Sequence, residues 1–419
     1  MLRAKSYYNP FFLQSVFANA DYSYNDKYLF DVSVRTDNSK VFSAFSLGWC
    51  ISKESFMKDI KWLDYLKFRG SYGKTGNMYA DWEYVNTTNF GLDSRFFHNH
   101  MGFVFDWFSR NTSDVYVNLQ PPGTSGTGSN IYTNNAAMKN SGFEATLNFN
   151  KSSGSFRFNT DFIFSAYHNE IGKGDYLFFD QGNTRTGTIV RNQPGHQVSS
   201  FYGYQVIGLF SDAADVASAP VQQGAQPGFF KYADLNGDKV IDSKDRTFLG
   251  DPNPDFTAGL SLELSFKRFD LGALLYLSQG NEIYNFTKWW TDFWPSFGGQ
   301  KSKRLLYNSW TESNKSASVP KATNTSNFST NTQNSSYFVE DGSYLRCRSI
   351  QLGYSLDERF LNKFKISSLR VYVQAVNLFT LTKYSGLDPE IGDYENAFGI
   401  DNGNYPNVRQ VSFGLQLGI

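Results

Sequence analysis

The chain has 419 residues, a formal net charge of zero and 18% aromatic residues, while its mean hydropathy is −0.44. The equal numbers of basic and acidic residues, 39 each, leave no basic footprint for nucleic acid and exclude that class of function. No apolar run of about 18 residues occurs, which excludes helical membrane spans. A polar average combined with many aromatic residues is typical of a β-barrel wall, although a soluble β-sandwich has the same totals.

The N-terminal part of the chain alternates between apolar and polar residues in paired segments joined by short turns. Residues 16–23 alternate in this way, Asn25 and Asp26 form a turn signal, and the alternation resumes over residues 28–35. A period of two with a two-residue turn predicts a β-hairpin. One face of this hairpin is apolar and the other carries charged side chains such as Asp31 and Arg35.

The same pattern continues to the end of the chain and predicts thirteen strands. Apolar residues recur at every second position over 143–149 and 156–164, and again over 260–266 and 269–277. The strands are expected near residues 13–24, 27–36, 43–51, 65–74, 83–93, 101–110, 141–150, 155–167, 256–266, 268–278, 343–355, 367–378 and 408–419. The last of them alternates up to Ile419, as a strand that closes a barrel does.

The lengths of the connections distinguish a membrane barrel from a sandwich. Turns of a few residues join the strands at one end, whereas long polar loops at residues 168–255, 279–342 and 379–407 join them at the other. Short periplasmic turns and long external loops are the outer-membrane pattern. We therefore predict an all-β protein, a transmembrane antiparallel β-barrel in the outer membrane of a Gram-negative bacterium. The stretch 313–336, rich in Asn, Ser and Thr, is expected to be flexible surface.

An odd number of strands implies that part of the barrel lies outside this sequence. Bacterial barrels of this type have an even number of strands. In addition, residues 1–12 contain no apolar stretch that resembles a signal peptide. We therefore expect residues 1–419 to be the C-terminal part of a barrel, with the chain starting inside an external loop.

An acidic segment in the first long loop has the spacing of a calcium-binding loop. Residues that can offer an oxygen atom as a ligand fall at positions 1, 3, 5, 7, 9 and 12. They are Asp234, Asn236, Asp238, Val240, Asp242 and Asp245. Lys239 stands where a glycine normally makes the sharp turn, and Asp245 replaces the usual glutamate. The spacing predicts a Ca²⁺ site of reduced affinity, and the alternative is an acidic turn without metal.

An aromatic cluster in the second long loop is the candidate contact surface. It consists of Trp289, Trp290, Phe293 and Trp294. Exposed aromatic faces with polar neighbours suit stacking on a sugar ring or contact with a partner protein. A membrane-interface girdle, or packing beneath a lid, is the more favoured interpretation of the same residues.

Several segments taken together resemble the SusC/RagA family of TonB-linked outer-membrane proteins. The segments that carry the resemblance span nearly the whole chain: Tyr22–Leu29, Ser46–Ser52, Leu66–Asn77, Asn140–Glu144, Phe201–Tyr204, Asp234–Asp238, Asp341–Arg346, Leu352–Tyr354 and Lys383–Glu390. The resemblance implies a barrel of about 22 strands with an N-terminal plug. About thirteen of those strands are expected here, without the plug.

The resemblance also implies a function and partners. Family members import oligosaccharides or peptides with energy relayed by TonB through the plug, and they pair with a SusD-like surface lipoprotein. Here the chain would supply the barrel wall and the external loops. The alternatives are a self-contained porin-like or adhesin-like barrel, and a soluble glycan-binding β-protein.

Enzymatic function has no support in the sequence. Charged residues expected on the lumen face either line a substrate path or form wall salt bridges that hold a plug; they are Arg35, Lys67, Arg69, Glu144, Arg157, Asp161 and Glu263. None of the four histidines stands beside a nucleophile or in a metal-binding motif. Cys50 and Cys347 are expected to be unpaired wall residues.

Overall fold

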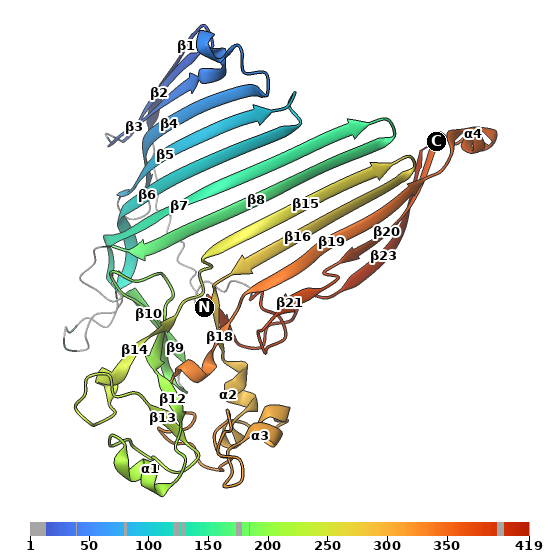
Figure 1. Ribbon diagram of the computed structural model, residues 1–419. Coiled ribbons are helices and arrows are strands. Elements are labelled where there is room, and N and C mark those ends of the chain that lie inside the picture. Colours follow the sequence, from blue (N-terminus) through green and yellow to red (C-terminus); the bar gives the residue numbers. More distant parts are fainter. Residues whose placement is uncertain are drawn as a thin grey trace, which may run out of the picture.

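The protein folds into a large curved antiparallel sheet and a smaller domain at one end of it (Figure 1). The computed structural model describes residues 14–38, 40–78, 82–119, 124, 126, 131–172, 178–183, 185–391 and 398–418. The smaller domain, called the loop domain below, consists of the described parts of three segments, 172–255, 280–343 and 377–409. The prediction of a nearly all-β protein is confirmed.

Thirteen strands follow one another through the sheet in chain order, each antiparallel to the next. They are β1 (Ser15–Tyr24), β2 (Tyr28–Asp37), β3 (Lys40–Cys50), β4 (Leu63–Met78), β5 (Trp82–Phe96), β6 (Met101–Leu119), β7 (Ile131–Ser153), β8 (Phe156–Ile171), β15 (Phe256–Phe266), β16 (Phe269–Gln279), β19 (Tyr344–Ser355), β20 (Ser368–Val376) and β23 (Gln410–Gly418). The short β21 (Thr380–Thr382) also pairs with β19. Every predicted strand is therefore present, but β6 and β7 extend well beyond the predicted 101–110 and 141–150.

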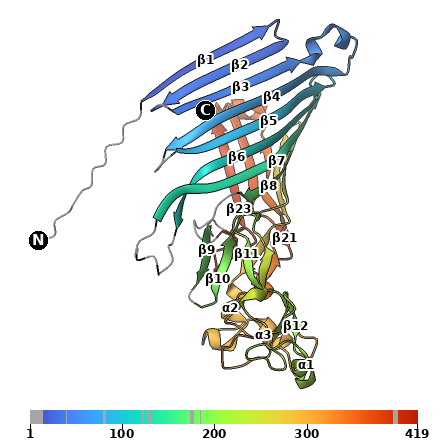
Figure 2. The same cartoon turned by 90° about the vertical axis from the view of Figure 1, so that its left-hand side faces the viewer.

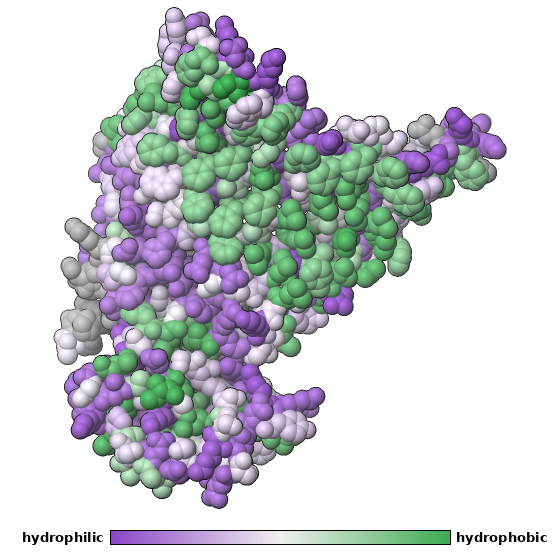
Figure 3. Space-filling view, viewed as in Figure 1, coloured by the Kyte–Doolittle hydropathy of each residue, from purple (hydrophilic) through white to green (hydrophobic). Residues whose placement is uncertain are grey.

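The alternation in the sequence sorts side chains onto two faces because facing residues in the register share a side of the sheet. Phe30 faces Leu47, and Phe162 faces Leu260. Aromatic rings stack from strand to strand on this face, with ring centres 5.7 Å apart for Phe143 and Phe164. The space-filling view shows the result as a broad apolar surface over the sheet (Figure 3).

The two ends of the sheet differ in the length of their connections. At one end β1 and β2 are joined by a turn in which Asn25 and Asp26 have φ of 52° and 51°, the left-handed conformation that a tight hairpin turn requires. At the same end β3 connects to β4 through two short 3-10 helices, η1 (Ile51–Lys53) and η2 (Ser55–Met57). The short helices α4 (Glu358–Leu361) and η7 (Asn362–Phe364) connect β19 to β20 there. The long segments that form the loop domain all leave from the opposite end.

The first and last strands of the sheet, β1 and β23, run in the same direction, because an antiparallel path of thirteen strands ends as it began. Among the described residues each pairs on one side only, β1 with β2 and β23 with β20. Figure 1 shows β1 and β23 at opposite edges of the sheet, and Figure 2 shows the sheet curling. β1 and β23 therefore cannot pair with each other in an antiparallel barrel. An odd number of further antiparallel strands between them would close such a barrel.

The loop domain contains short strands and helices. Its strands are β9 (Phe178–Asn183), β10 (Gly187–Asn192), β11 (Phe201–Tyr204), β12 (Val206–Leu209), β13 (Phe230–Tyr232), β14 (Arg246–Gly250), β17 (Glu282–Asn285), β18 (Val339–Asp341) and β22 (Ile400–Asp401). Its helices are α1 (Ala213–Ser218), α2 (Thr287–Thr291) and α3 (Lys303–Asn308), with 3-10 helices η4 (Ser243–Asp245), η5 (Trp294–Ser296) and η6 (Ser336–Phe338). Across the described residues, no helix is long and apolar enough to span a membrane.

The main hydrophobic core lies in the loop domain and not in the sheet. Phe201, Phe230, Tyr284 and Phe338 are fully buried there, and they come from different long segments. Ile400 joins the same core from the third segment. Such contacts between distant parts of the sequence make the three loops one folded unit.

Candidate functional site: the polar face of the sheet and the loop domain

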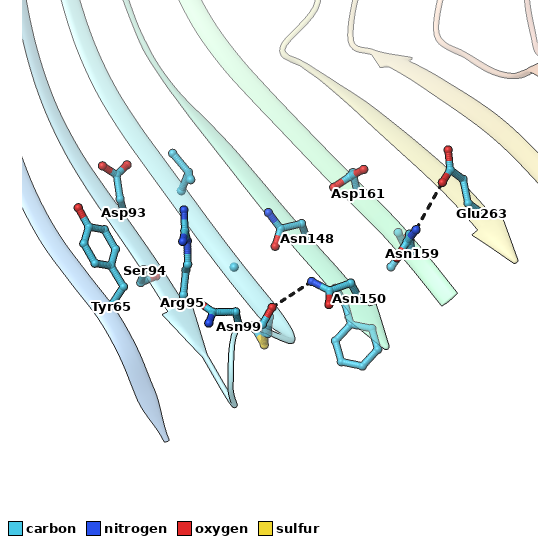
Figure 4. Close-up of a pocket in the computed structure, with 15 residues that line it drawn as sticks. Tyr65, Asp93, Ser94, Arg95, Asn99, Asn148, Asn150, Asn159, Asp161 and Glu263 are labelled. Carbon is cyan, nitrogen blue, oxygen red and sulfur yellow. Dashed lines mark hydrogen bonds between the residues drawn. The ribbon is translucent and has the colours of Figure 1, made fainter. Parts of the chain in front are cut away.

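A polar pocket lies on the face of the sheet opposite the apolar surface, near the short-turn end. It has a volume of about 840 Å³ and is lined by residues of six neighbouring strands, β4, β5, β6, β7, β8 and β15 (Figure 4). Asp93, Arg95, Asn148, Asp161 and Glu263 are among the residues that line it. The predicted lumen residues Asp161 and Glu263 are thus brought together.

Beside this pocket, Arg69 holds three strands together through two carboxylates. Its guanidinium lies 3.0 Å from Asp93 on β5 and 2.7 Å from Asp106 on β6. The arginine fits because the facing residue is Gly91, where a Cβ atom would lie 2.5 Å from the Cζ atom of Arg69. Arg69 is among the predicted lumen residues, whereas Gly91 was not predicted; its signal is a glycine within an alternating strand.

Part of the predicted lumen charge has no ion-pair partner among the described residues. Arg35 pairs with Asp37 at 2.8 Å, as a wall salt bridge would. For Asp161 and Glu263, no ion pair is found within the part of the chain that the structure describes, and Asn159 lies 3.5 Å from Glu263. The pocket therefore presents carboxylates to whatever fills the curved sheet.

The predicted aromatic cluster lies in the loop domain, in or beside its core. Trp289 and Phe293 are buried, and the indole N–H of Trp289 donates to the backbone oxygen of Asn331 at 2.7 Å. Trp290 packs edge to face on Trp289. Only Trp294 of the four is strongly exposed, at 56%. Trp289 and Phe293 therefore pack inside the loop domain, and a contact role stays a prediction for Trp290 and Trp294.

A buried charge network connects this cluster to the rest of the loop domain. The ammonium of Lys288 lies 2.7 Å from Glu340, and it donates to the backbone oxygen of Tyr337 at 2.7 Å. Burial lowers the pKa of Lys288 despite the attraction of Glu340. Burial alone would raise the pKa of Glu340, but Lys288 and hydrogen bonds from Ser385 outweigh it and hold that pKa below its ordinary value.

A second buried network attaches the third long segment to the sheet. Arg346 on β19 is 1% exposed and pairs with both Asp388 and Glu390, while its Nε donates to Thr380 at 2.9 Å. Arg348 lies 2.8 Å from Glu390 as well. Two arginines two residues apart on a strand share a face, so the pairing fixes the 388–390 segment over the end of the sheet.

The carboxylates of the acidic segment are bound to the segment's own backbone. Asp234 accepts from the backbone N–H of Gly237 at 2.7 Å and of Lys239 at 2.9 Å. Lys239 has φ of 65°, the conformation normally taken by glycine at that position. Buried Asp245 accepts from Leu235 and Asp242. Within the described residues, no three His, Cys, Asp or Glu side chains converge as a metal site, so Ca²⁺ binding stays a prediction.

The expectation that residues 313–336 form flexible surface is wrong for residues 329–335, whereas most of residues 313–328 are exposed or half-buried. Ser329, Asn331 and Ser335 are almost completely buried. The amide of Asn331 donates to Ser296 at 2.8 Å, and the hydroxyl of Ser329 donates to the backbone oxygen of Gln223 at 2.7 Å. Polar side chains that satisfy buried backbone groups can fill a domain interior, so a polar composition did not mean exposure here.

The sequence of the chain is similar to those of known proteins. The sequence profile described as TonB dependent receptor-like, beta-barrel, matches residues 3–239. The TonB-dependent receptor P3 of Formosa agariphila is 32% identical over 99% of this chain and 46% of its own length. The TonB-dependent receptor SusC of Bacteroides thetaiotaomicron is 27% identical over 97% of this chain and 43% of its own length.

A solved structure supports the same relationship. The RagAB peptide transporter superposes with a TM-score of 0.78 and 25% identity, over 97% of this chain and 47% of that chain. The present chain therefore spans about half the length of the curated relatives it matches.

Proposed function

The chain belongs to the TonB-dependent receptor β-barrel family, and from this premise we propose that it supplies wall and external loops of an outer-membrane nutrient importer. The predicted SusC/RagA resemblance and the predicted transmembrane antiparallel barrel are thereby confirmed. The family is one of the outer membrane, and the relatives are receptors and not enzymes. The cargo, the partners and the role of each region are our proposal.

The observation that carries the proposal is the separation of polar and apolar side chains across the sheet. Apolar residues such as Phe413 and Leu415 are exposed on one face, as they are where a wall meets lipid. The opposite face carries the polar pocket with Asp161 and Glu263. A soluble glycan-binding β-protein would not expose so many large apolar side chains to water.

The cargo we propose is an oligosaccharide or a peptide. The names SusC and RagAB peptide transporter belong to the relatives, and they support a nutrient of one of these two classes here. TonB would supply energy through a plug that lies against the polar face, where the carboxylates of Asp161 and Glu263 suit basic side chains. A SusD-like lipoprotein would cover the loop domain.

We also retain calcium as a proposed ligand of the acidic segment. The backbone amides that hold Asp234 and Asp238 orient their carboxylates, and Val240 offers a backbone carbonyl. These oxygen donors fit a hard cation. A bound Ca²⁺ would have a structural role, since it would hold the turn between β13 and β14.

Uptake in the source bacterium tests the proposed function. Deletion of the gene should abolish growth on one class of nutrient, either oligosaccharides or peptides, as the only carbon source, and the intact gene should restore it. Removal of TonB should abolish growth to the same extent. If uptake continued without TonB, the porin-like alternative would replace the importer.

A further inference from the structure

A second cavity lies in the loop domain, away from the polar face of the sheet. It has a volume of about 730 Å³ and lies between η5, α3 and the segment that follows α3. A smaller cavity of about 470 Å³ adjoins it, and the two share Trp294, Lys321 and Ala322 in their walls. We call this two-part cavity the Trp294 groove. Its combined size exceeds that of a single side chain and suits a short chain segment.

The floor of the groove contains a buried hydrogen-bond donor without an acceptor. Trp310 lines the larger cavity and is 4% exposed, and its indole N–H has no partner within the described residues. A buried polar group without a partner costs about 1–3 kcal/mol. One face of the ring is closed by Gly228, where a Cβ atom would lie 2.5 Å from the indole.

The rim of the groove is apolar and exposed. Trp294 stands between the two cavities, and Leu306 on α3 is 72% exposed. The ammonium of Lys301 donates to the backbone oxygens of Trp290 and Phe293 at 2.9 and 2.8 Å, which fixes the chain around Trp294. A fixed rim with large exposed apolar side chains is the usual form of an anchor site in a protein interface.

The charge of the groove selects the partner. Lys303 and Lys321 line it and are exposed, and Glu312 is the one carboxylate in the wall of the larger cavity. The Nζ atom of Lys321 lies 5.8 Å from the centre of the Trp310 ring, so this positive charge is next to the unpaired donor. Positive charges around an apolar anchor site favour a segment that carries carboxylates beside its apolar side chains.

We propose that the Trp294 groove is a docking site for an acidic segment of another protein, which inserts apolar side chains on either side of Trp294. The carboxylates of this segment face Lys303 and Lys321. The inference does not depend on import, because it rests on the loop domain alone. Sugar binding and self-association are the outcomes against which it is tested.

The test uses the protein purified from its outer membrane in detergent and three short fluorescein-labelled peptides. The first carries two leucines among aspartates, the second has lysines in place of the aspartates, and the third has serines in place of the leucines. Fluorescence anisotropy should report binding of the first peptide only, weakened by about 0.5 M salt because the charges are then screened. Binding of the lysine peptide with equal affinity, or no binding of the first peptide up to about 1 mM, would overturn the proposal.

Variants locate the binding to the groove. The double variant Lys303→Glu, Lys321→Glu should bind the first peptide with an affinity lower by about tenfold or more. The double variant Lys244→Glu, Lys383→Glu changes the net charge equally but lies outside the groove, so it should bind this peptide as the unmodified protein does. Leu306→Asp should weaken binding as well, with Val221→Asp as the exposed apolar control. Equal loss in groove and control variants would contradict the assignment.

Displacement of the peptide by a neutral oligosaccharide would assign the groove to sugar, and peptide-blocked dimerisation of the protein would assign it to self-association. Either result would overturn the proposal.

Discussion

The sheet and the loop domain place the same residue types in opposite environments. Phe413 on β23 is 84% exposed, whereas Phe201, Phe230 and Phe338 in the loop domain are completely buried. The loop domain carries its own aromatic core, as a water-soluble domain does. The sheet instead leaves its apolar face to lipid and its polar face to whatever occupies the interior. Aromatic content alone therefore says little about a segment until the burial of its rings is known.

The largest expected effect compares phenylalanine truncations in the two regions. Phe230→Ala should destabilise the loop domain by about 3–5 kcal/mol, because it leaves a cavity in a closed core. Phe413→Ala should cost clearly less, since lipid or detergent fills the space around an exposed ring. Denaturant titration monitored by proteolysis within the loop domain measures the first, and heat-dependent gel migration measures the second. Equal losses of stability in the two variants would contradict the difference between the two regions.

A charge on the lipid face should have the next largest effect. Leu262→Arg is expected to destabilise the inserted barrel by about 2–4 kcal/mol, because it places a guanidinium in the hydrocarbon region. The neighbouring Glu263 lines the polar pocket on the opposite face, so Glu263→Gln is the matched control and should be nearly neutral. A refolding titration into lipid vesicles checks both. If Leu262→Arg left the stability unchanged and Glu263→Gln lowered it, the face assigned to lipid would be the polar interior face and the reverse.

Acidification should act on the loop domain through Glu340. Its pKa in the folded protein lies below its ordinary value of 4.5, so the unfolded chain binds a proton first as the pH falls. The stabilisation is complete above about pH 4.5 and is lost as the pH falls through the lowered pKa. Glu340→Gln should cost about 1.5–3 kcal/mol at neutral pH, because Lys288 loses its charged partner.

The same variant should reduce the loss of stability on acidification. Asp215 and Asp341 also have lowered pKa values in the loop domain, so some acid sensitivity should remain. Thermal unfolding of the loop domain as a function of pH measures the difference between the two proteins. Identical pH profiles for wild type and variant would show that Glu340 does not contribute to the acid sensitivity of the loop domain.

The smallest expected effect concerns the acidic segment. Lys239→Gly should stabilise the loop domain by about 1 kcal/mol, because φ is positive at that position and glycine takes this conformation without steric cost. Gly237→Ala, at φ of 78°, should have the opposite sign. If Ca²⁺ binds, EGTA should lower the melting temperature of both proteins, and more so for Lys239→Gly. No effect of EGTA on either would leave an acidic turn without metal.

The sheet was predictable because its information is local. Alternation over a few residues predicted every strand of the path, and the turn signal at Asn25 and Asp26 predicted the first hairpin. The extensions of β6 and β7 were missed because residues 111–114 and 133–140 are mostly polar or small, although the two extensions pair with each other, as Val117 does with Thr133. Backbone pairing there does not require an apolar face.

The loop domain was less predictable because its contacts join distant residues. Tyr284 packs on Phe201 and donates its hydroxyl to Asn334, and none of these pairs leaves a local pattern in the sequence. The aromatic cluster was found from composition, but its burial depended on Asn331 from a stretch expected to be surface. The Trp294 groove could not be predicted, since Trp310 and Lys321 were not part of any motif.

The membrane topology tests the relation between the two regions most directly. Single cysteines at Val221 in the loop domain and at Gly154 in a short turn would be probed in intact cells with a membrane-impermeant maleimide. The native Cys50 and Cys347 are buried and should react little. We predict labelling at position 221 without permeabilisation, and labelling at position 154 only after the outer membrane is opened. Labelling at position 154 alone in intact cells would contradict the assignment of the loop domain to the cell exterior and of the sheet to the barrel wall.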